Sequence, residues 1–597
     1  LIHHTLTATL LATLFGAGTT HAQNNIGNTV LDNRNDTRIE IVSVFGDVPT
    51  HGYAPVRVSI KNGTTTDRTW TFSFSINSNT NHSYAPDLFT STFRLSADKQ
   101  SQAVHDVLVP IPTLFTSGYS YGGPRLNVDI SGGGYGSERH YLDSNTTGDS
   151  PITVLSSGIA NKNLSLLNDE ARKRTSSSGG SNFGSSFDPA MLPNNWLGYT
   201  GVDVLLITDD EWIDVNPGVR TAVTDWVRLG GALHIYSTKP NLDLEDLGLP
   251  SAPGKRSDKL TLGTAEIYQW DGKDLDIKAT YNSYQQRYKK DILNAKRQSL
   301  SKDFISNWGL QNALGGRKFA SWQVAVILVI FGILVGPVNL FVFAKAGQRH
   351  RLFFTTPIIS IGTSLLLIVL IFLQDGTGGE GRRLALVAID ETARKAYQIQ
   401  EQVSRTGVLF GNDFATDEPA FISAVPMGKS QWASLSGTRN RGDHSYSLID
   451  QTTFAGDWFK SRSEQSQYIE TITATRARIE RLPGDDTTPT LVSGLDVTIE
   501  TLYYIDDAGE VWRSTAAVPV GQKAQLQASD TATFESELKK LTDLASAKLG
   551  SRISDLQSKH GSFFAITNAS NPLVPTLSSV AWNDDITIIH GQVTTPE

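Results

Sequence analysis

Two long apolar stretches in the middle of the chain constrain its fold more than any other feature. Residues 324–344 (VAVILVIFGILVGPVNLFVFA) and 352–373 (LFFTTPIISIGTSLLLIVLIFL) contain no charged side chain. Each matches the roughly 20 residues that a helix needs to cross the hydrocarbon core of a bilayer. The short segment between them, 345–351, carries Lys345, Arg349 and Arg351, and a short basic loop favours the cytoplasmic side. The sequence therefore predicts a transmembrane hairpin with a cytoplasmic loop.

The first 22 residues have the pattern of a secretory signal peptide. Their apolar part, from about Leu6 to Ala17, is too short to span a bilayer comfortably and gives way to small and polar residues before Ala22. A retained anchor helix is the alternative, and both interpretations export the segment that follows. Two later spans return the chain to the side it left. We therefore expect a protein of the bacterial inner membrane with both large regions, before and after the hairpin, on the periplasmic side.

Composition limits the classes of function and partner. The formal net charge is −8, which argues against nucleic acid as a partner because phosphate binding needs a basic surface. The sequence has no cysteine, which excludes disulfides, thiolate metal sites and a cysteine nucleophile. A chain of 597 residues is too long for one core, so several domains are expected.

The exported region before the hairpin divides into two predicted domains and a linker. Residues 23–150 contain strands with period-two alternation, such as Val56, Val58 and Ile60 between polar residues, and predict a β-sandwich after an Asn-rich, disordered start. Residues 151–270 read as strand, helix and strand, which predicts an α/β domain with a parallel sheet. Residues 271–323 are predicted to form a helical linker, with Trp308 and Trp322 near the membrane interface.

Within the α/β domain the best-defined elements are one strand and one helix. Val202–Ile207 is a continuous apolar run, typical of a strand buried on both faces. Asn216 and Pro217 form an N-cap and first-turn pair for a helix that ends at Gly230. The predicted buried face of this helix consists of Val219, Ala222, Val223, Trp226 and Val227.

After the hairpin, residues 374–597 predict an exported β-rich domain with one amphipathic helix. The helix would place Phe534, Leu538, Leu541, Ala545 and Leu549 on one face. In the first span, Asn339 is expected to bond to a hydroxyl of the second span, with Thr355, Thr356, Ser360, Thr363 and Ser364 as candidate partners.

Two stretches resemble a known group. Residues 192–233 (LPNNWLGYTGVDVLLITDDEW and the following helix and strand) and GPVNLFVF at 336–343 resemble large bacterial membrane proteins with an exported class I glutamine-amidotransferase-like domain and a GPVN-type hairpin. The resemblance implies the order β-domain, α/β domain, hairpin and β-rich domain. Class I amidotransferases use a cysteine nucleophile, and this chain has neither cysteine nor a G-x-S-x-G motif in its place.

Three carboxylates follow the Val202–Ile207 strand, at the sheet edge where α/β enzymes place their chemistry. They could bind a metal or act as acid and base, or they could be the polar, solvated exit of a strand that stabilises nearby helix N-termini. We favour the second interpretation and expect that replacing all three leaves folding intact. The candidate surface comprises Asp209, Asp210, Glu211 and Trp212, with Trp196 and Tyr199, whose rings we expect to pack over the sheet edge.

Three functional hypotheses remain open at this point. The leading one is a non-catalytic, membrane-anchored envelope protein whose exported domains bind a protein or an envelope polymer. The second is an auxiliary subunit of an export or envelope-assembly machine, with the hairpin packed against a transporter. The third is a metal-dependent hydrolase that uses Asp209, Asp210 and Glu211. The sequence predicts no cofactor, no resident metal and no complete catalytic constellation, with the lipid bilayer and a protein of the envelope or membrane as partners.

Overall fold

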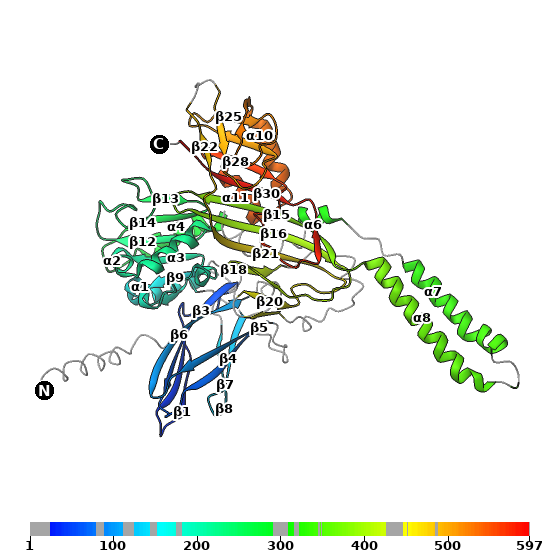
Figure 1. Cartoon of the computed structure of the whole chain (residues 1–597). Helices are drawn as coiled ribbons and strands as arrows, with labels where there is room; N and C mark the ends of the chain where they lie inside the picture. The colour runs from blue at the N-terminus through cyan, green and yellow to red at the C-terminus, as the bar shows by residue number, and fades with distance from the viewer. Residues whose placement is uncertain are drawn as a thin grey trace.

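The chain forms a multi-domain, β-rich structure with mixed α/β sheets and two apolar helices, as predicted (Figure 1). The computed structural model describes residues 24–49, 51–78, 89–111, 124–143, 152–174, 182–290, 308–315, 321–343, 347, 349–425, 446–449, 452–483 and 488–595. The predicted signal peptide, residues 1–22, lies outside the described residues.

Two sheets form the N-terminal sandwich. The first has the order β1-β2-β3-β6, with β1 (Asn25–Asp32), β2 (Thr37–Ser43), β3 (Gly52–Asn62) and β6 (Ser101–Ile111). Val56, Val58 and Ile60 are buried, as their alternation predicts. The prediction of a disordered start was wrong, because β1 pairs along β2 and buries Ile26 in the sandwich core.

The second sheet contains strands from both sides of the hairpin. Its order is β17-β20-β19-β5-β4-β7-β8, so β5 lies between β4 and β19. β19 runs parallel to β5, and Thr90 lies opposite Ser447. The strands before the hairpin are β4 (Arg68–Ser78), β5 (Phe89–Ala97), β7 (Pro124–Gly132) and β8 (Tyr135–Asp143). Those after it are β17 (Phe414–Ala415), β19 (Tyr446–Ile449) and β20 (Thr453–Gly456).

The α/β unit has the sheet order β10-β9-β11-β12-β14-β13, parallel except for β13. Val204 and Leu206 of β11 pack on one face with α1, and Leu205 and Ile207 pack on the other with α3, so helices cover both faces. Strands are β9 (Thr153–Ser156), β10 (Ser185–Phe187), β11 (Val204–Thr208), β12 (Ala232–Ser237), β13 (Ser257–Leu260) and β14 (Gly263–Gln269). Helices are α1 (Ser157–Arg174), α2 (Asp209–Asp214), α3 (Pro217–Arg228) and α4 (Ile277–Lys290), with 3-10 turns at Pro189–Met191 and Trp196–Tyr199.

The predicted helix after Asn216 is confirmed in detail. Asn216 accepts a hydrogen bond from the Gly218 amide, and Pro217 occupies the first turn of α3. All five apolar residues predicted for its inner face are buried.

Two apolar helices project away from the folded domains (Figure 1). They consist of α7 (Ser321–Ile333), a π-helical continuation (Leu334–Phe343) that contains Pro337, a 3-10 turn (Arg349–Arg351) and α8 (Leu352–Asp375). Both are long and apolar enough to span a membrane. Asn339 is buried between them and donates to Thr356 Oγ1 at 2.9 Å, which confirms the predicted contact.

A 13-stranded sheet forms the centre of the molecule and begins directly after α8. Its main order is β18-β21-β16-β15-β30-β28-β24-β25-β27. The strands are β15 (Gly379–Asp390), β16 (Lys395–Thr406), β18 (Ala420–Ala424), β21 (Glu464–Ala474), β24 (Thr501–Ile505), β25 (Val511–Ser514), β27 (Leu526–Ser529), β28 (Ser562–Thr567) and β30 (Ile586–Thr594). Shorter strands flank this path: β22 (Ile479–Arg481), β23 (Leu491–Ser493), β26 (Lys523–Ala524) and β29 (Val580–Trp582).

The single amphipathic helix predicted for the C-terminal region is two helices, α10 (Thr531–Thr542) and α11 (Ala547–Leu556). The chain breaks between them because Ser546 caps α11 by accepting from the Leu549 amide. The carbonyl of Leu544 instead accepts a hydrogen bond from Leu310, in the short helix α6 (Gly309–Leu314) before the hairpin. A tertiary contact therefore replaces the continuous helix.

The α/β unit is fixed to the central sheet by polar contacts of α3. Asp225 accepts from Tyr397 Oη at 2.8 Å and forms an ion pair with Lys395 at 2.6 Å, both on β16. Arg228 forms an ion pair with Asp390 at 2.9 Å. Just after α3, the Gly230 carbonyl accepts a hydrogen bond from Arg552 of α11 at 3.1 Å. The parts before and after the hairpin thus share one packed interface.

Candidate functional site

The three predicted carboxylates form the first turn of α2 instead of a solvated loop. Thr208 ends β11 and caps α2, since its hydroxyl accepts from the Glu211 amide at 3.2 Å. The Glu211 carboxylate in turn accepts from the Thr208 amide at 3.2 Å, which completes a capping box. Negative charge at this position is favoured by the helix dipole. The three candidate carboxylates therefore lie at the start of a helix.

Glu211 also reaches the N-terminus of the neighbouring helix α1. Its carboxylate accepts from the Gly158 amide at 2.8 Å and from the Ser156 hydroxyl. The chain leaves β9 toward β10 and leaves β11 in the opposite direction toward β12, so Ser156 and Glu211 flank the point where strand order reverses. Ligands of open α/β sheets bind at such points, often with an anionic group on a helix N-terminus. Here the Glu211 side chain itself contacts that N-terminus.

Asp209 and Asp210 share one lysine. Asp209 is 3% exposed, accepts from the Ser237 hydroxyl at 3.0 Å and lies 2.9 Å from the Lys239 ammonium. Asp210 is solvent-exposed and lies 3.1 Å from the same ammonium. These contacts, led by the hydrogen bond to Asp209, raise the pKa of Lys239 above its ordinary value. The lysine remains charged and neutralises part of the acidic cluster.

The aromatic members of the candidate surface are all buried. Trp212 donates to the Leu247 carbonyl at 3.0 Å, and Tyr199 donates to the Pro193 carbonyl at 2.7 Å. Trp196 belongs to the central hydrophobic core, with Tyr53 and Leu229. Their rings pack within the protein and present no open stacking surface. Among the described residues, no group of three or more His, Asp or Glu side chains is close enough to hold a metal ion.

A carboxylate that the sequence analysis did not single out occupies the most enclosed position. Glu401 of β16 is fully buried and accepts from the Trp308 indole at 3.2 Å, the Ser546 amide at 2.9 Å and the Ser546 hydroxyl. Burial raises the pKa of Glu401 to about 7, while these donors and the nearby Lys548 act in the opposite direction. Trp308 was predicted at the membrane interface. That prediction was wrong, because Trp308 is buried in the protein and its indole donates to Glu401.

The groups around Glu401 come from several parts of the chain and hold them together. Lys548 of α11 lies 3.1 Å from Glu470 and above the Tyr468 ring, and both of those residues belong to β21. All of these side chains are largely buried. Strongly shifted pKa values occur at catalytic sites and also in structural networks. This cluster joins the segment before the hairpin, β16, β21 and α11.

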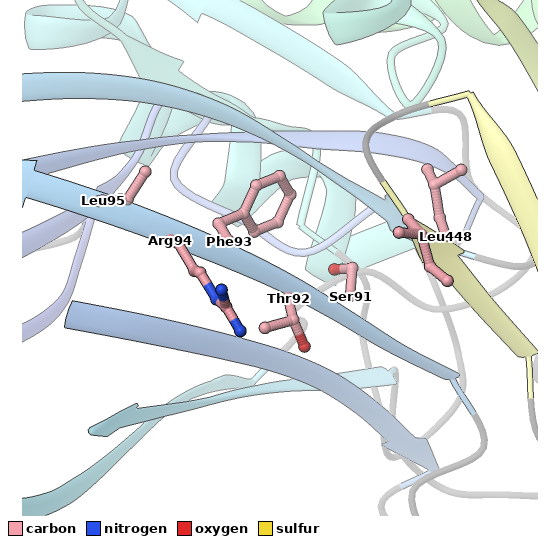
Figure 2. Close-up of a pocket in the computed structure, with 7 residues that line it drawn as sticks. Ser91, Thr92, Phe93, Arg94, Leu95 and Leu448 are labelled. Atoms are coloured by element: carbon pink, nitrogen blue, oxygen red, sulfur yellow. The ribbon is translucent and has the colours of Figure 1, made fainter. Parts of the chain in front are cut away.

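An open groove lies where β5 extends beyond β19. A cavity of about 590 Å³ is lined by Ser91, Thr92, Phe93, Arg94 and Leu95, with Leu448 and Ile449. Figure 2 shows Phe93 and Arg94 on opposite sides of β5. Because consecutive residues of a strand point to opposite faces, a cavity lined by all of 91–95 follows the backbone edge. We call these seven residues the β5 groove.

The comparisons with known proteins add little to this geometry. No protein-family model and no curated protein matches the chain. Similar solved structures include a Paenibacillus sp. cycloisomaltooligosaccharide glucanotransferase complexed with cycloisomaltoheptaose (11% identity, TM-score 0.17, covering 33% of this chain and 27% of that one). Another is a calcium-binding mutant of Bacteroides uniformis beta-glucuronidase 2 (12% identity, TM-score 0.14, covering 36% and 24%). The chain spans only about a quarter of these enzymes, and the likeness assigns no function.

The contacts of Glu211 revise the expectation that all three carboxylates are dispensable for folding. Glu211→Ala removes acceptors at the starts of both α1 and α2 and is expected to cost about 1–3 kcal/mol of stability. Asp210→Asn, at an exposed ion pair, should change stability by less than about 0.5 kcal/mol. Urea unfolding of the detergent-purified full chain measures both variants. Equal stability of the two would show that Glu211 does not bridge the helices.

Glu401 predicts a specific pH dependence of stability. Its pKa in the folded protein is about 7, above the ordinary 4.5, so the folded state binds a proton more readily than the unfolded chain. This contribution is fully present below pH 4.5 and is lost as pH rises through 7. The difference in unfolding free energy between wild type and Glu401→Gln should therefore change by up to about 3 kcal/mol between pH 4.5 and 8, with wild type losing more.

Unfolding titrations of both proteins at several pH values test this, with Glu470→Gln as a control at the neighbouring buried carboxylate. The glutamine at 401 can accept from Trp308 and the Ser546 amide through its oxygen and donate to the Ser546 hydroxyl, so the variant is expected to fold. Parallel pH profiles for wild type and Glu401→Gln would refute the assignment.

Proposed function

We propose that this protein is a membrane-anchored binding protein of the bacterial envelope, which captures an extended segment of a partner protein in the β5 groove. The observation that carries the proposal is the partial pairing of β5. β4 pairs with β5 along its whole length, whereas the described part of β19 pairs only with residues 89–91. In the part of the chain that the structure describes, no strand pairs with residues 92–97 on that edge. At the end of β5, the Ser96 carbonyl is hydrogen-bonded to the His105 ring of β6 at 2.9 Å, so the open stretch is residues 92–95.

An unpaired strand edge offers a row of backbone donors and acceptors to an incoming strand. Main-chain hydrogen bonds supply affinity in this mode of recognition, and pockets for alternate side chains supply specificity. The β5 groove has both parts, because the cavity follows the backbone edge of residues 91–95 and has apolar walls from Phe93, Leu95 and Leu448. Ile449, which is 49% exposed, extends the apolar wall at the end of β19.

The side chains of the groove suggest the chemistry of the partner segment. One face of β5 presents Phe93, whose ring packs edge-on against Phe74 of the sandwich core. The other face presents the Arg94 guanidinium, which suits a carboxylate. A strand that alternates apolar and acidic residues fits both faces. A protein segment is thus favoured over an envelope polysaccharide, which has no backbone amides to extend the sheet.

The other domains give this groove a fixed place at the membrane. The hairpin holds the body at the bilayer, and we propose that the body faces the exported side, consistent with the basic loop residues Arg349 and Arg351. We further propose that the α/β unit is a class I glutamine-amidotransferase-like domain that lacks the nucleophile and acts as a packing module. Its parallel sheet and its contacts with β16 support this assignment. The auxiliary-subunit and hydrolase hypotheses remain predictions.

Site-specific photo-crosslinking in cells tests the binding site. A benzoylphenylalanine at Arg94 should give a discrete protein adduct after irradiation. The same residue at Tyr141, 57% exposed on β8 at the far end of the same sheet, is the control and should not. A synthetic peptide of the crosslinked segment should then slow amide exchange at residues 92–95. No adduct, an adduct to polysaccharide, or the same adduct from both positions would refute the proposal.

A further inference from the structure

The end of α8 is joined to the central sheet by a tight set of backbone hydrogen bonds. Gly376 ends the helix, and its carbonyl accepts from the Val408 amide at 3.0 Å. Gly378 donates to the Val408 carbonyl at 3.1 Å and accepts from Gly407 at 2.7 Å. Both Gly376 and Gly378 have positive φ, at 71° and 80°. Residues 407 and 408 are therefore fixed to the residues that directly follow the helix, and they begin the segment 407–411.

Phe410, in this segment, is 84% exposed and yet held in place. Its ring stacks on Phe372, with centroids 6.4 Å apart and planes 15° apart. The next residue toward β16, Leu409, donates to the Ser461 hydroxyl at 2.9 Å and packs against the central core. The anchored backbone keeps this large apolar ring outside the core. Its exposure to water is unfavourable unless another apolar surface covers it.

The position of Phe372 along α8 sets the depth of that ring. α8 has 24 residues and is about 36 Å long, whereas the hydrocarbon core of a bilayer is about 30 Å thick. Phe372 lies one turn before the end of the helix at Asp375. It therefore lies where the hydrocarbon gives way to the headgroups. At the same end of the hairpin, Trp322 near the start of α7 is 65% exposed, and tryptophan is enriched at this boundary.

We propose that Phe410 is a membrane-interface anchor: the segment 407–411 rests on the outer boundary of the hydrocarbon and inserts the Phe410 ring beside Phe372. The occupant of this apolar surface is lipid, because the ring contacts the helix that itself spans the bilayer. The insertion adds a third fixed point to the two helices. It sets the tilt of the central sheet, and with it the height of the β5 groove above the membrane. This inference is independent of the proposed ligand.

The absence of cysteine from the sequence makes a direct test possible. Phe410→Cys and Val104→Cys, the latter 54% exposed on β6 of the sandwich, are each labelled with the fluorophore NBD. The full-length proteins are reconstituted at low density in phosphatidylcholine–phosphatidylglycerol vesicles. Iodide in the outer solution should quench the label at position 410 severalfold less than the label at 104. A lipid brominated near its carbonyl should quench only the label at 410.

Two outcomes would overturn the proposal. Equal iodide quenching at both positions would place Phe410 in water. Protection at 410 that grows with protein density, without quenching by brominated lipid, would assign the surface to a second copy of the chain. Because Phe410 is exposed and its substitution removes no core contact, the variant is expected to fold, and an unfolding midpoint equal to that of Val104→Cys verifies this. The vesicles contain no other protein, so protection cannot come from an unidentified partner.

Discussion

The pairing of β5 with β19 is the contact on which the arrangement of the molecule depends. The two strands lie on either side of the hairpin in the sequence, and they are neighbours in one sheet. Backbone hydrogen bonds between these strands join the regions before and after the hairpin into one packed body. The contacts of Asp225 with β16 and of Arg552 with Gly230 require the same arrangement. The two apolar helices are thus inserted into one folded body.

Buried polar side chains line both faces of β16 in the central sheet. On one face of β16, Gln398, Gln400 and Gln402 are buried and form a chain of side-chain hydrogen bonds at 3.0 Å that continues to Gln467 of β21. On the other face Glu401 holds Trp308 and Ser546. Buried polar groups stabilise only when each finds its partners, so a mispaired strand here would be costly. We infer that this network selects the register of β16 against β21.

Local patterns in the sequence predicted the local structure well. The alternation around Val58, the apolar run at Val204, the cap at Asn216 and the bond between Asn339 and the second span all appear in the structure. Each depends on residues close in sequence or on the two helices of one hairpin. The periodicity of a strand or helix reports which face is buried, and that information is contained in a short window.

The features that the sequence did not predict have one physical cause in common. Each depends on residues that lie far away in the chain. Nothing near Tyr446 or Phe89 indicates that their strands pair across more than 350 residues. The break at Ser546 depends on Leu310, and the burial of Trp308 depends on Glu401. At the candidate carboxylates, the sequence indicated a strand exit but not that Glu211 would bridge two helices. One sequence feature could have indicated the buried cluster around Glu401. This acidic residue follows the period-two alternation of Tyr397 and Ile399 and so lies on the same strand face.

The pairing across the hairpin can be tested with one disulfide. Thr90 and Ser447 are directly opposite, at a spacing that suits a disulfide between parallel strands. In the cysteine-free chain, Thr90→Cys with Ser447→Cys should form a crosslink. A protease site inserted after Gly347 then cuts the chain into two fragments, which should stay together on a non-reducing gel. The mismatched pair Thr90→Cys with Val520→Cys should separate. Separation of both pairs to the same extent would contradict a single body built from both sides of the hairpin.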